Sequence, residues 1–344
     1  MHVQRNEPLA PLNTLALQSS AQYLIHATSD ETVAAAIGFA REHRLPIMPL
    51  GSGSNIVFTE DVQCLVLHMA TRGIQIIEDT NSSIVLRVAA GENWHELVAN
   101  AVQKGWYGLE NLALIPGTVG AAPIQNIGAY GVELAPLVER VHCLELENGR
   151  ATHFDRKQCE FAYRDSVFKQ SLRDKFVITG VDLRLQREAQ VQTDYPALAD
   201  QLQQKPHEEV TPQQIFEAVV AIRRRKLPDP LDVPNAGSFF KNPVVNANRA
   251  RELRQEFAAL PQYAQSDGDI KLPAAWLIEH CGWKGYRRDG LGVHPEHALV
   301  LVNYGSGQGR PLLHLAREIA DSVLDVFDIA LEIEPRVYGS WSRE

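Results

Sequence analysis

The chain has 344 residues, which predicts two or three domains at about 150 residues per domain. Hydrophobic residues make up 45% of it and charged residues 22%, an ordinary globular composition that excludes a disordered, collagen-like or coiled-coil protein. The net charge of −9 argues against a protein that binds duplex nucleic acid, which usually presents a basic face, but is compatible with a local basic pocket for a small anion.

Cysteines and apolar segments indicate the compartment. The four cysteines, Cys64, Cys143, Cys159 and Cys281, form no C-x-x-C pair, so they indicate neither a zinc site nor a thioredoxin-type motif. Scattered thiols are typical of a reducing compartment. Residues 1–13 lack the apolar stretch of a signal peptide, and no apolar run approaches the roughly 20 residues that span a bilayer. We therefore expect a cytoplasmic protein that contacts no membrane.

The first segment predicts alternating helices and strands. Apolar residues recur at helical spacing over 33–40, after two candidate N-caps, Ser29 and Asp30. A short apolar run follows at 45–50. Strands are then expected at 64–68, 74–78 and 84–88, and a second helix over 94–102.

Residues 105–136 carry six glycines and show neither helical nor strand periodicity. A long loop with so many glycines is usually functional, because its backbone must approach something closely. We therefore expect this segment to be part of the functional site. Strands are expected again at 138–145 and 176–185.

The C-terminal part is divided from the rest by prolines. Residues 211–214 carry a Thr cap, Pro at the first helical position and Gln at the third, which together predict the start of a helix. Pro228 and Pro230 end that helix, and we expect a domain boundary there. The remainder predicts a strand at 298–302, a helix over 312–327 and a terminal strand at 329–333.

Two glycine-serine loops invite comparison with phosphate-binding loops. Residues 51–55 follow an apolar strand, where backbone N–H groups can surround a phosphate. They do not form a G-x-G-x-x-G motif, because Ile56 stands where glycine is needed, and alone such a loop is more often a simple turn. Residues 305–309 lack the Lys-Ser/Thr pair of a P-loop, and we interpret them as a connecting loop.

Two polar clusters are candidates for chemistry. Tyr163–Ser166 forms either a solvated turn with a surface Arg–Asp contact, worth little, or an arginine fork that grips a carboxylate. In Asn235–Pro243 two phenylalanines lie between small and polar residues. Ser238 in this segment is a candidate proton donor, although a lone serine is more often a turn residue.

Charged side chains raise further alternatives. Glu332 and Glu334 would share a face of the predicted terminal strand; burial would raise at least one pKa, whereas exposure would leave both as solvating charges. Residues 223–226 either complement the helix macrodipole or form a pocket for a diphosphate. His294 and His297 lack a third ligand, so no metal site is expected.

These motifs together resemble one family. The segments that carry the resemblance are Asn13-Thr14, Gly51–Asn55, Pro116–Gly131, Tyr163–Ser166, Asn235–Pro243 and Glu332–Glu334. They resemble the UDP-N-acetylenolpyruvoylglucosamine reductases (MurB) from about residue 13 to residue 339, and the stretches PGTVGAAPIQNIGAYG and NAGSFFKNP are highly specific together. The first half also resembles the wider vanillyl-alcohol-oxidase type of FAD-binding fold.

The resemblance implies an α+β fold with three domains. Two would form a PCMH-type FAD-binding unit, from residues 1–70 plus 330–344 and from residues 71–226. An α/β substrate-binding domain would span residues 227–329. Tyr195 falls in an extra loop near 190–205, which type I members use to cover the substrate, so the resemblance implies type I.

The resemblance also implies the site residues and ligands. The catalytic residues would be Arg164, Ser238 and Glu334, and the substrate-binding residues Tyr195, Lys226, Asn242 and His297. The implied cofactor is FAD, the reductant NADPH, and the expected state a monomer. The residues implied to bind the cofactor are Gly51, Ser52, Gly53, Ser54, Asn55, Pro116, Gly117, Thr118, Gly120, Asn126, Ile127, Gly128, Ala129, Tyr130 and Gly131.

The implied reaction is the NADPH-dependent reduction of UDP-N-acetyl-3-O-(1-carboxyvinyl)-glucosamine, an enolpyruvyl ether, to UDP-N-acetylmuramate, in peptidoglycan precursor synthesis. Arg164 would stabilise charge on the substrate carboxylate, Glu334 would help as a protonated donor, and Ser238 would protonate the α-carbon. One alternative is an FAD-dependent oxidase of the same fold that uses oxygen, which would need neither Ser238 nor the two glutamates. Another is a nucleotide-sugar binding module without flavin, against which the intact glycine-rich stretch argues.

Overall fold

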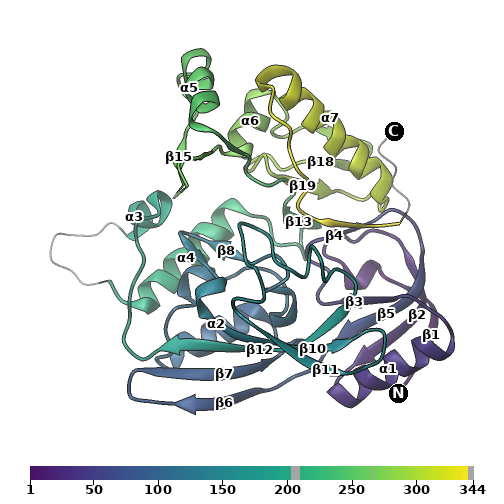
Figure 1. The fold of residues 1–344 in the computed structure, drawn as a ribbon. Coiled ribbons are helices and arrows are strands. Elements are labelled where there is room, and N and C mark those ends of the chain that lie inside the picture. The colour runs from purple at the N-terminus through teal and green to yellow at the C-terminus, as the bar shows by residue number, and fades with distance from the viewer. Residues whose placement is uncertain (203–209, 266, 340–344) are drawn as a thin grey trace. The chain divides into compact units, whose positions relative to one another are not determined.

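The computed structural model describes residues 1–202, 210–265 and 267–339. The chain separates into two compact units, which Figure 1 shows as a ribbon. The first unit contains residues 1–7, 21–52 and 63–225, and the second contains residues 8–20, 53–62 and 226–339. Both units combine helices with sheets, which confirms the predicted α+β class. The division into three domains stays a prediction.

The first unit begins with a four-stranded sheet of order β1-β2-β5-β3. Helix α1 (Asp30–Glu42) packs on it through Val33, Ile37 and Ala40, and the Ser29 hydroxyl caps the helix by accepting the N–H of Thr32 at 3.3 Å. The helix is thus confirmed. The strands are β1 (Gln4–Pro8), β2 (Ser20–Ala27), β3 (Ile47–Leu50) and β5 (Val62–Met69).

A five-stranded antiparallel sheet of order β11-β10-β12-β7-β6 forms the rest of the first unit's framework. Helices α2 (Trp94–Gln103) and α4 (Pro212–Lys226) share one apolar core with this sheet. The strands are β6 (Ile74–Asp79), β7 (Ser83–Ala89), β10 (Val138–Glu145), β11 (Ala151–Asp155) and β12 (Phe176–Gln186).

The start of α4 follows its sequence signals. The backbone N–H of Thr211 donates to Gln214 Oε1 at 2.8 Å, and the Gln214 N–H donates to Thr211 Oγ1 at 3.3 Å. This reciprocal pair is a capping box, which satisfies two N–H groups that the helix itself leaves unbonded. The predicted helix start is therefore confirmed.

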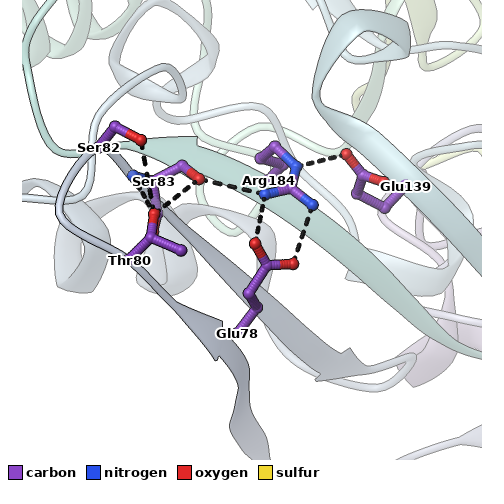
Figure 2. A network of polar contacts seen from close by, with 6 residues as sticks. All are labelled: Glu78, Thr80, Ser82, Ser83, Glu139 and Arg184. Atoms are coloured by element: carbon purple, nitrogen blue, oxygen red, sulfur yellow. Dashed lines mark hydrogen bonds and ion pairs between the residues drawn. The ribbon is translucent and has the colours of Figure 1, made fainter.

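A polar network joins four strands of this sheet (Figure 2). Arg184 on β12 donates to Glu139 on β10 at 2.6 Å, to both carboxylate oxygens of Glu78 on β6 at 3.1 Å, and to Ser83 on β7 at 3.1 Å. All three charged side chains are substantially exposed to solvent. Exposed ion pairs add little stability, so we expect the network to contribute little to the stability of the fold.

The glycine-rich segment 105–136 is irregular, as predicted. It contains the 3₁₀ turns η2 (Glu110–Leu112), η3 (Val119–Ala121) and η4 (Ala135–Leu137) and a small hairpin of β8 (Gly128–Ala129) and β9 (Val132–Glu133). Its apolar side chains join the core beneath α2 and α4. Helix α3 (Pro196–Leu202) completes the described part of the first unit.

The second unit is built on a sheet of order β13-β19-β18-β17, packed against helix α7 (Gly309–Phe327). Its strands are β13 (Asn235–Ser238), β17 (Arg287–Arg288), β18 (Leu291–Val293) and β19 (Val300–Asn303). The other elements are η1 (Ala10–Leu12), helices α5 (Ala247–Glu256) and α6 (Ala274–His280), a small sheet of β14 (Val244–Val245), β16 (Ile270–Lys271) and β15 (Tyr263–Ala264), and the parallel pair β4 (Ile56–Phe58) and β20 (Arg336–Tyr338).

The predicted terminal strand at 329–333 is wrong. Of its residues only Ile333 makes a β-bridge, to Phe240, and the final strand is β20 instead. Pro335 has no backbone N–H to extend a ladder, so regular pairing starts only after it. Glu332 and Glu334 therefore lie on an irregular segment.

No helix in the described parts of the chain is long and apolar enough to cross a membrane.

Candidate active site

Residues 51 and 52, which begin the glycine-serine loop after β3, belong to the first unit. A Cβ atom on Gly51 would lie 2.6 Å from the Thr118 hydroxyl, so this loop and the 116–131 loop meet where a side chain would not fit. The Ser52 hydroxyl is buried and, among the described residues, has no hydrogen-bond partner. Buried polar groups normally have a partner, so this hydroxyl is suited to a polar atom of a bound ligand.

Residues 53–55 of the same loop belong to the second unit. Gly53 has a φ of +64°, and a Cβ there would lie 2.1 Å from the carbonyl oxygen of Leu12. Only glycine fits this position. The Gly53 carbonyl accepts the N–H of Thr14 at 3.1 Å, and that of Asn55 accepts the N–H of Arg336 at 3.0 Å. Ser54 lies between these two fixed carbonyls.

The first half of the 116–131 loop lies against the end of β7 and the start of α2. The Gly117 carbonyl, after Pro116, accepts the N–H of Trp94 at 3.1 Å, and Thr118 bridges Asn93. The backbone N–H of Gly120 donates to the carbonyl of Ala90 at 2.8 Å. A Cβ atom added to Gly120 would lie 2.5 Å from the Cβ atom of Ala90. The glycines thus let two backbones touch.

Asn126 in the second half of this loop is buried, and its side chain binds protein atoms. Its Nδ2 donates to Glu133 at 2.9 Å and to the Ala162 carbonyl at 3.0 Å, and its Oδ1 accepts the N–H of Ala135 at 3.0 Å. The side chain therefore fixes the loop, while Ile127, Ala129 and Gly131 continue the backbone from it. Direct cofactor contacts by these residues stay a prediction.

Arg164 is held against the β8–β9 hairpin. Its Nη2 donates to the Gly128 carbonyl at 2.5 Å, and Lys169 donates to the Arg164 carbonyl at 3.0 Å. A Cβ on Gly128 would lie 2.9 Å from Arg164 Nη1. The neighbouring Ser166 hydroxyl donates to the Ile124 carbonyl at 2.6 Å. Tyr163–Ser166 is therefore a turn fixed to the glycine-rich loop, rather than a solvated one.

Five side chains of the first unit form a cluster around Tyr130, here called the Tyr130 cluster. Arg223 interacts with the Tyr130 hydroxyl and repels Arg164 electrostatically, and its Nε donates to the Leu114 carbonyl at 3.1 Å. Burial lowers the pKa of Arg223 and raises that of Tyr130. The members of the cluster are Tyr130, Arg164, Tyr195, Arg223 and Arg225.

Tyr195 joins this cluster from the start of α3. Its ring contacts that of Tyr130 edge to face, with centroids 5.2 Å apart, and 45% of the residue is exposed. Arg225 donates to Gln201 at 3.1 Å and so links α4 to α3. Residues 203–205, the end of the predicted tyrosine loop, lie outside the described residues.

In the second unit Ser238 and Glu334 lie on neighbouring segments. Ser238 ends β13 opposite Val300 of β19. The backbone N–H of Glu334 donates at 2.9 Å to the carbonyl of Phe239, the residue after Ser238. The structure thus brings together two predicted catalytic residues that are 96 positions apart in the sequence.

The two glutamates of the C-terminal segment have different surroundings. Glu332 is exposed and pairs with Lys241, with Nζ and Oε1 2.5 Å apart. Glu334 is half-buried. Of the alternatives, Glu332 is therefore a solvated charge, and Glu334 is the carboxyl suited to a functional site.

Three predicted substrate residues belong to this second unit. Asn242 Oδ1 accepts the N–H of Ala274 at 2.9 Å and so caps α6. His297 lies in the turn before β19, where its Nδ1 accepts the N–H of Leu299 at 3.3 Å. Lys226 is exposed at the end of α4. The structure does not test their contact with a substrate, which stays a prediction.

Sequence reasoning missed two side chains that hold this site. Asn111 is 3% exposed and donates to the carbonyls of Tyr130 and Gln192. The motif Tyr163–Ser166 gives no separate role to Ser166, although its hydroxyl anchors the arginine turn by donating to the Ile124 carbonyl. The sequence does offer one signal for Asn111, which is a polar residue within a largely apolar stretch. If such a residue is buried, its polar groups require specific hydrogen-bond partners, which predicts a structural role for it.

Comparison with known proteins identifies the family. The model for the C-terminal domain of UDP-N-acetylenolpyruvoylglucosamine reductase matches residues 229–338, and an FAD binding domain model matches residues 21–155. UDP-N-acetylenolpyruvoylglucosamine reductase from Pseudomonas aeruginosa is 44% identical over 338 residues, 98% of this chain and 99% of that protein. The protein of the same name from Pseudomonas fluorescens is 43% identical over the same share of each chain.

A solved structure shares the fold. UDP-N-acetylenolpyruvylglucosamine reductase (MurB) from Thermus caldophilus has a TM-score of 0.67 and 24% sequence identity, with 98% of this chain and 100% of that chain covered. The resemblance noted in the sequence motifs is therefore confirmed over the full length of the relatives. The chain belongs to the UDP-N-acetylenolpyruvoylglucosamine reductase family.

Proposed function

We propose that Arg164, Ser238 and Glu334 perform the chemistry of an FAD-dependent oxidoreductase that uses NADPH to reduce enolpyruvyl-UDP-N-acetylglucosamine to UDP-N-acetylmuramate. Full-length similarity to the reductases supports this reaction, and the match to an FAD binding domain supports the cofactor. The observation that carries the residue assignment is the position of Arg164, whose guanidinium donates to Gly128 in the predicted flavin loop.

The residues present fit FAD. The Ser52 hydroxyl lacks a protein partner among the described residues, and the neighbouring Gly51 packs so closely against Thr118 that the loop is fixed beside it. In the 116–131 loop, close backbone packing at Gly120 fixes the loop before any ligand binds. The FAD held by these residues would supply hydride-transfer chemistry between NADPH and the enolpyruvyl double bond.

Arg164 would bind the substrate carboxylate. Reduction at the methylene carbon places negative charge on the α-carbon, and this charge spreads into a carboxylate that is already anionic. A guanidinium stabilises such charge through paired donors, and most effectively when it is fixed in advance. The bonds at Gly128 and Lys169 fix Arg164 in this way.

Glu334 would act on the same charge as a hydrogen-bond donor, and Ser238 would act on it as the proton donor. A carboxyl can donate a hydrogen bond only while protonated, and the proposal therefore requires Glu334, which is half-buried, to be in its neutral form. Ser238 would deliver its hydroxyl proton to the α-carbon; an alcohol is a weak acid, but a carbanion-like enolate is a strong base. The bond between the Glu334 N–H and the Phe239 carbonyl supports a joint role.

Two arginines of the Tyr130 cluster, Arg223 and Arg225, would bind phosphate. NADPH and the sugar nucleotide each carry a diphosphate, so one cationic surface can serve the two ligands in turn. Arg223 and Arg225 supply this charge on a protein with a net charge of −9, and local positive charge attracts anionic ligands even where the whole protein is acidic.

The test follows the visible flavin spectrum of the purified protein without oxygen. We expect NADPH to bleach the flavin band and the enolpyruvyl sugar nucleotide to restore it. Recovery only after oxygen is admitted would favour the oxidase alternative. A protein that binds the sugar nucleotide but carries no flavin would be a binding module.

The finer features implied by the family resemblance are also proposals. We infer a cytoplasmic monomer of type I with three domains, in which the tyrosine loop covers the substrate. Gel filtration at enzyme concentrations used for turnover tests the monomer, and limited proteolysis followed by mass spectrometry tests the domain boundaries near residues 70 and 226.

A further inference from the structure

The side chain of Asn111 joins two segments of the first unit. Its Nδ2 donates to the carbonyl of Tyr130 and to the carbonyl of Gln192, both at 3.0 Å. Asn111 is 3% exposed, so both bonds are protected from water. An amide nitrogen has two N–H groups, and this one uses both to hold backbone atoms that lie 62 positions apart in the sequence.

The two carbonyls belong to segments whose side chains meet. Gln192 lies three residues before Tyr195, whose own carbonyl accepts the N–H groups of Leu198 and Ala199 at the start of α3. The rings of Tyr130 and Tyr195 are in edge-to-face contact. One buried amide therefore fixes the backbone next to both rings.

The turn that carries Asn111 is itself fixed. The Glu110 carboxylate accepts the N–H of Gly108 at 2.7 Å, and the Trp94 indole donates to the Leu112 carbonyl at 2.9 Å. These contacts hold the residues on both sides of Asn111. The side chain of Asn111 thus extends from a rigid turn. A residue that orients other groups needs such a fixed support.

We propose that Asn111 is a positioning residue for substrate binding, which holds Tyr195 against the flavin loop. The inference rests on the proposed function, which makes Tyr195 a substrate contact. Asn111 itself is buried and acts only through the segment 192–195. Aspartate and leucine have nearly the same size but no N–H group, so neither can bridge two carbonyls.

The experiment compares wild type with Asn111→Leu in the FAD-loaded enzyme. Each protein is reduced by NADPH without oxygen and mixed with increasing concentrations of the enolpyruvyl sugar nucleotide. We expect the half-saturating concentration to rise about tenfold, as for the loss of one hydrogen bond. The limiting rate of flavin reoxidation should change by less than about twofold, because binding is weakened rather than the chemical step.

A double-mutant cycle separates this role from general destabilisation. If Asn111 acts through Tyr195, Asn111→Leu adds nothing to the weaker binding of Tyr195→Ala. The matched control is Asn303→Leu, since Asn303 is also 3% exposed and donates to a carbonyl, that of Leu15, at 2.8 Å. This control should leave the half-saturating concentration unchanged. Asn111→Ser, which retains one donor, serves if Asn111→Leu does not fold, and should give a smaller rise.

Calorimetric titration of the oxidised enzyme with the sugar nucleotide gives the same comparison without turnover. Additive losses in the double variant, unchanged binding by Asn111→Leu, or an equal loss in Asn303→Leu would overturn the inference. Failure of the proposed function is distinct, because then the sugar nucleotide does not reoxidise the wild-type flavin. If Tyr195→Ala binds substrate normally while the wild type turns over, only the positioning role is lost.

Discussion

The ion network around Asp182 gives a quantitative prediction about stability. Asp182 on β12 is 3% exposed and accepts from Arg87 Nε at 2.8 Å, from Arg87 Nη2 at 2.9 Å and from His142 Nε2 at 2.8 Å. Burial acts to raise its pKa, but the hydrogen bonds from Arg87 and His142 outweigh burial and lower the pKa to about 2.

The magnitude follows from linkage between protonation and folding. The ordinary pKa of this carboxyl is 3.8 and the folded-state value is about 2, which corresponds to about 2 kcal/mol of stability when it is ionised. This contribution is complete above about pH 4 and is lost as the pH falls towards 2. Asp182→Asn should therefore cost about 2 kcal/mol at pH 7 and should remove this loss of stability in acid.

Thermal unfolding at constant, saturating FAD tests the prediction. The first unit has about 200 residues, so 2 kcal/mol corresponds to a fall in Tm of about 4–8 °C. The control is Glu139→Gln, which breaks one bond of the exposed Arg184 network in Figure 2 and should lower Tm by about 1 °C or less. A fall below about 2 °C for Asp182→Asn at pH 7, or equal acid sensitivity of variant and wild type, would refute the reasoning.

Three further predictions concern the site. Gly128→Ala should slow flavin reoxidation by substrate about a hundredfold, since the new Cβ would displace Arg164; an unchanged single-turnover rate would contradict this. Ser238→Ala should retain bleaching by NADPH and lose recovery with the sugar nucleotide, whereas equal loss of both half-reactions would exclude a proton-donor role. Glu334→Gln, permanently neutral, should remove the fall in activity that deprotonation causes as pH rises; a pH–rate profile like that of wild type would count against a protonated Glu334.

Local signals predicted the helices best. The Ser29 cap and the Thr211–Gln214 capping box mark real helix starts, because their hydrogen bonds join residues only three positions apart. Strands β7, β10 and β12 were also predictable, since β7 and β12 are largely buried and mostly apolar and β10 has buried apolar residues spaced between polar ones. In these cases the sequence of the element itself contains most of the information.

Other elements depend on residues far away in the chain. Strand β1 is polar along its length and is a strand only because it pairs at the edge of the first sheet. The segment 329–333 has an apolar, strand-like sequence, but Pro335 and the path beside Phe239 leave it irregular. The Asn111 bridge to Gln192 spans 81 positions, and periodicity cannot predict such a pair.

The glycines of the site show why the motif was predictable while its physical reason was not. The sequence suggested that they make room for a ligand, yet the space of their missing side chains is occupied by the protein: Thr118 beside Gly51, Leu12 beside Gly53, Ala90 beside Gly120 and Arg164 beside Gly128. These contacts fix the loops in the absence of any ligand. A binding loop that is already ordered loses less conformational entropy when its ligand binds. The glycines therefore favour cofactor and substrate binding by preorganising the backbone and Arg164, which is what a fixed charge-stabilising donor requires.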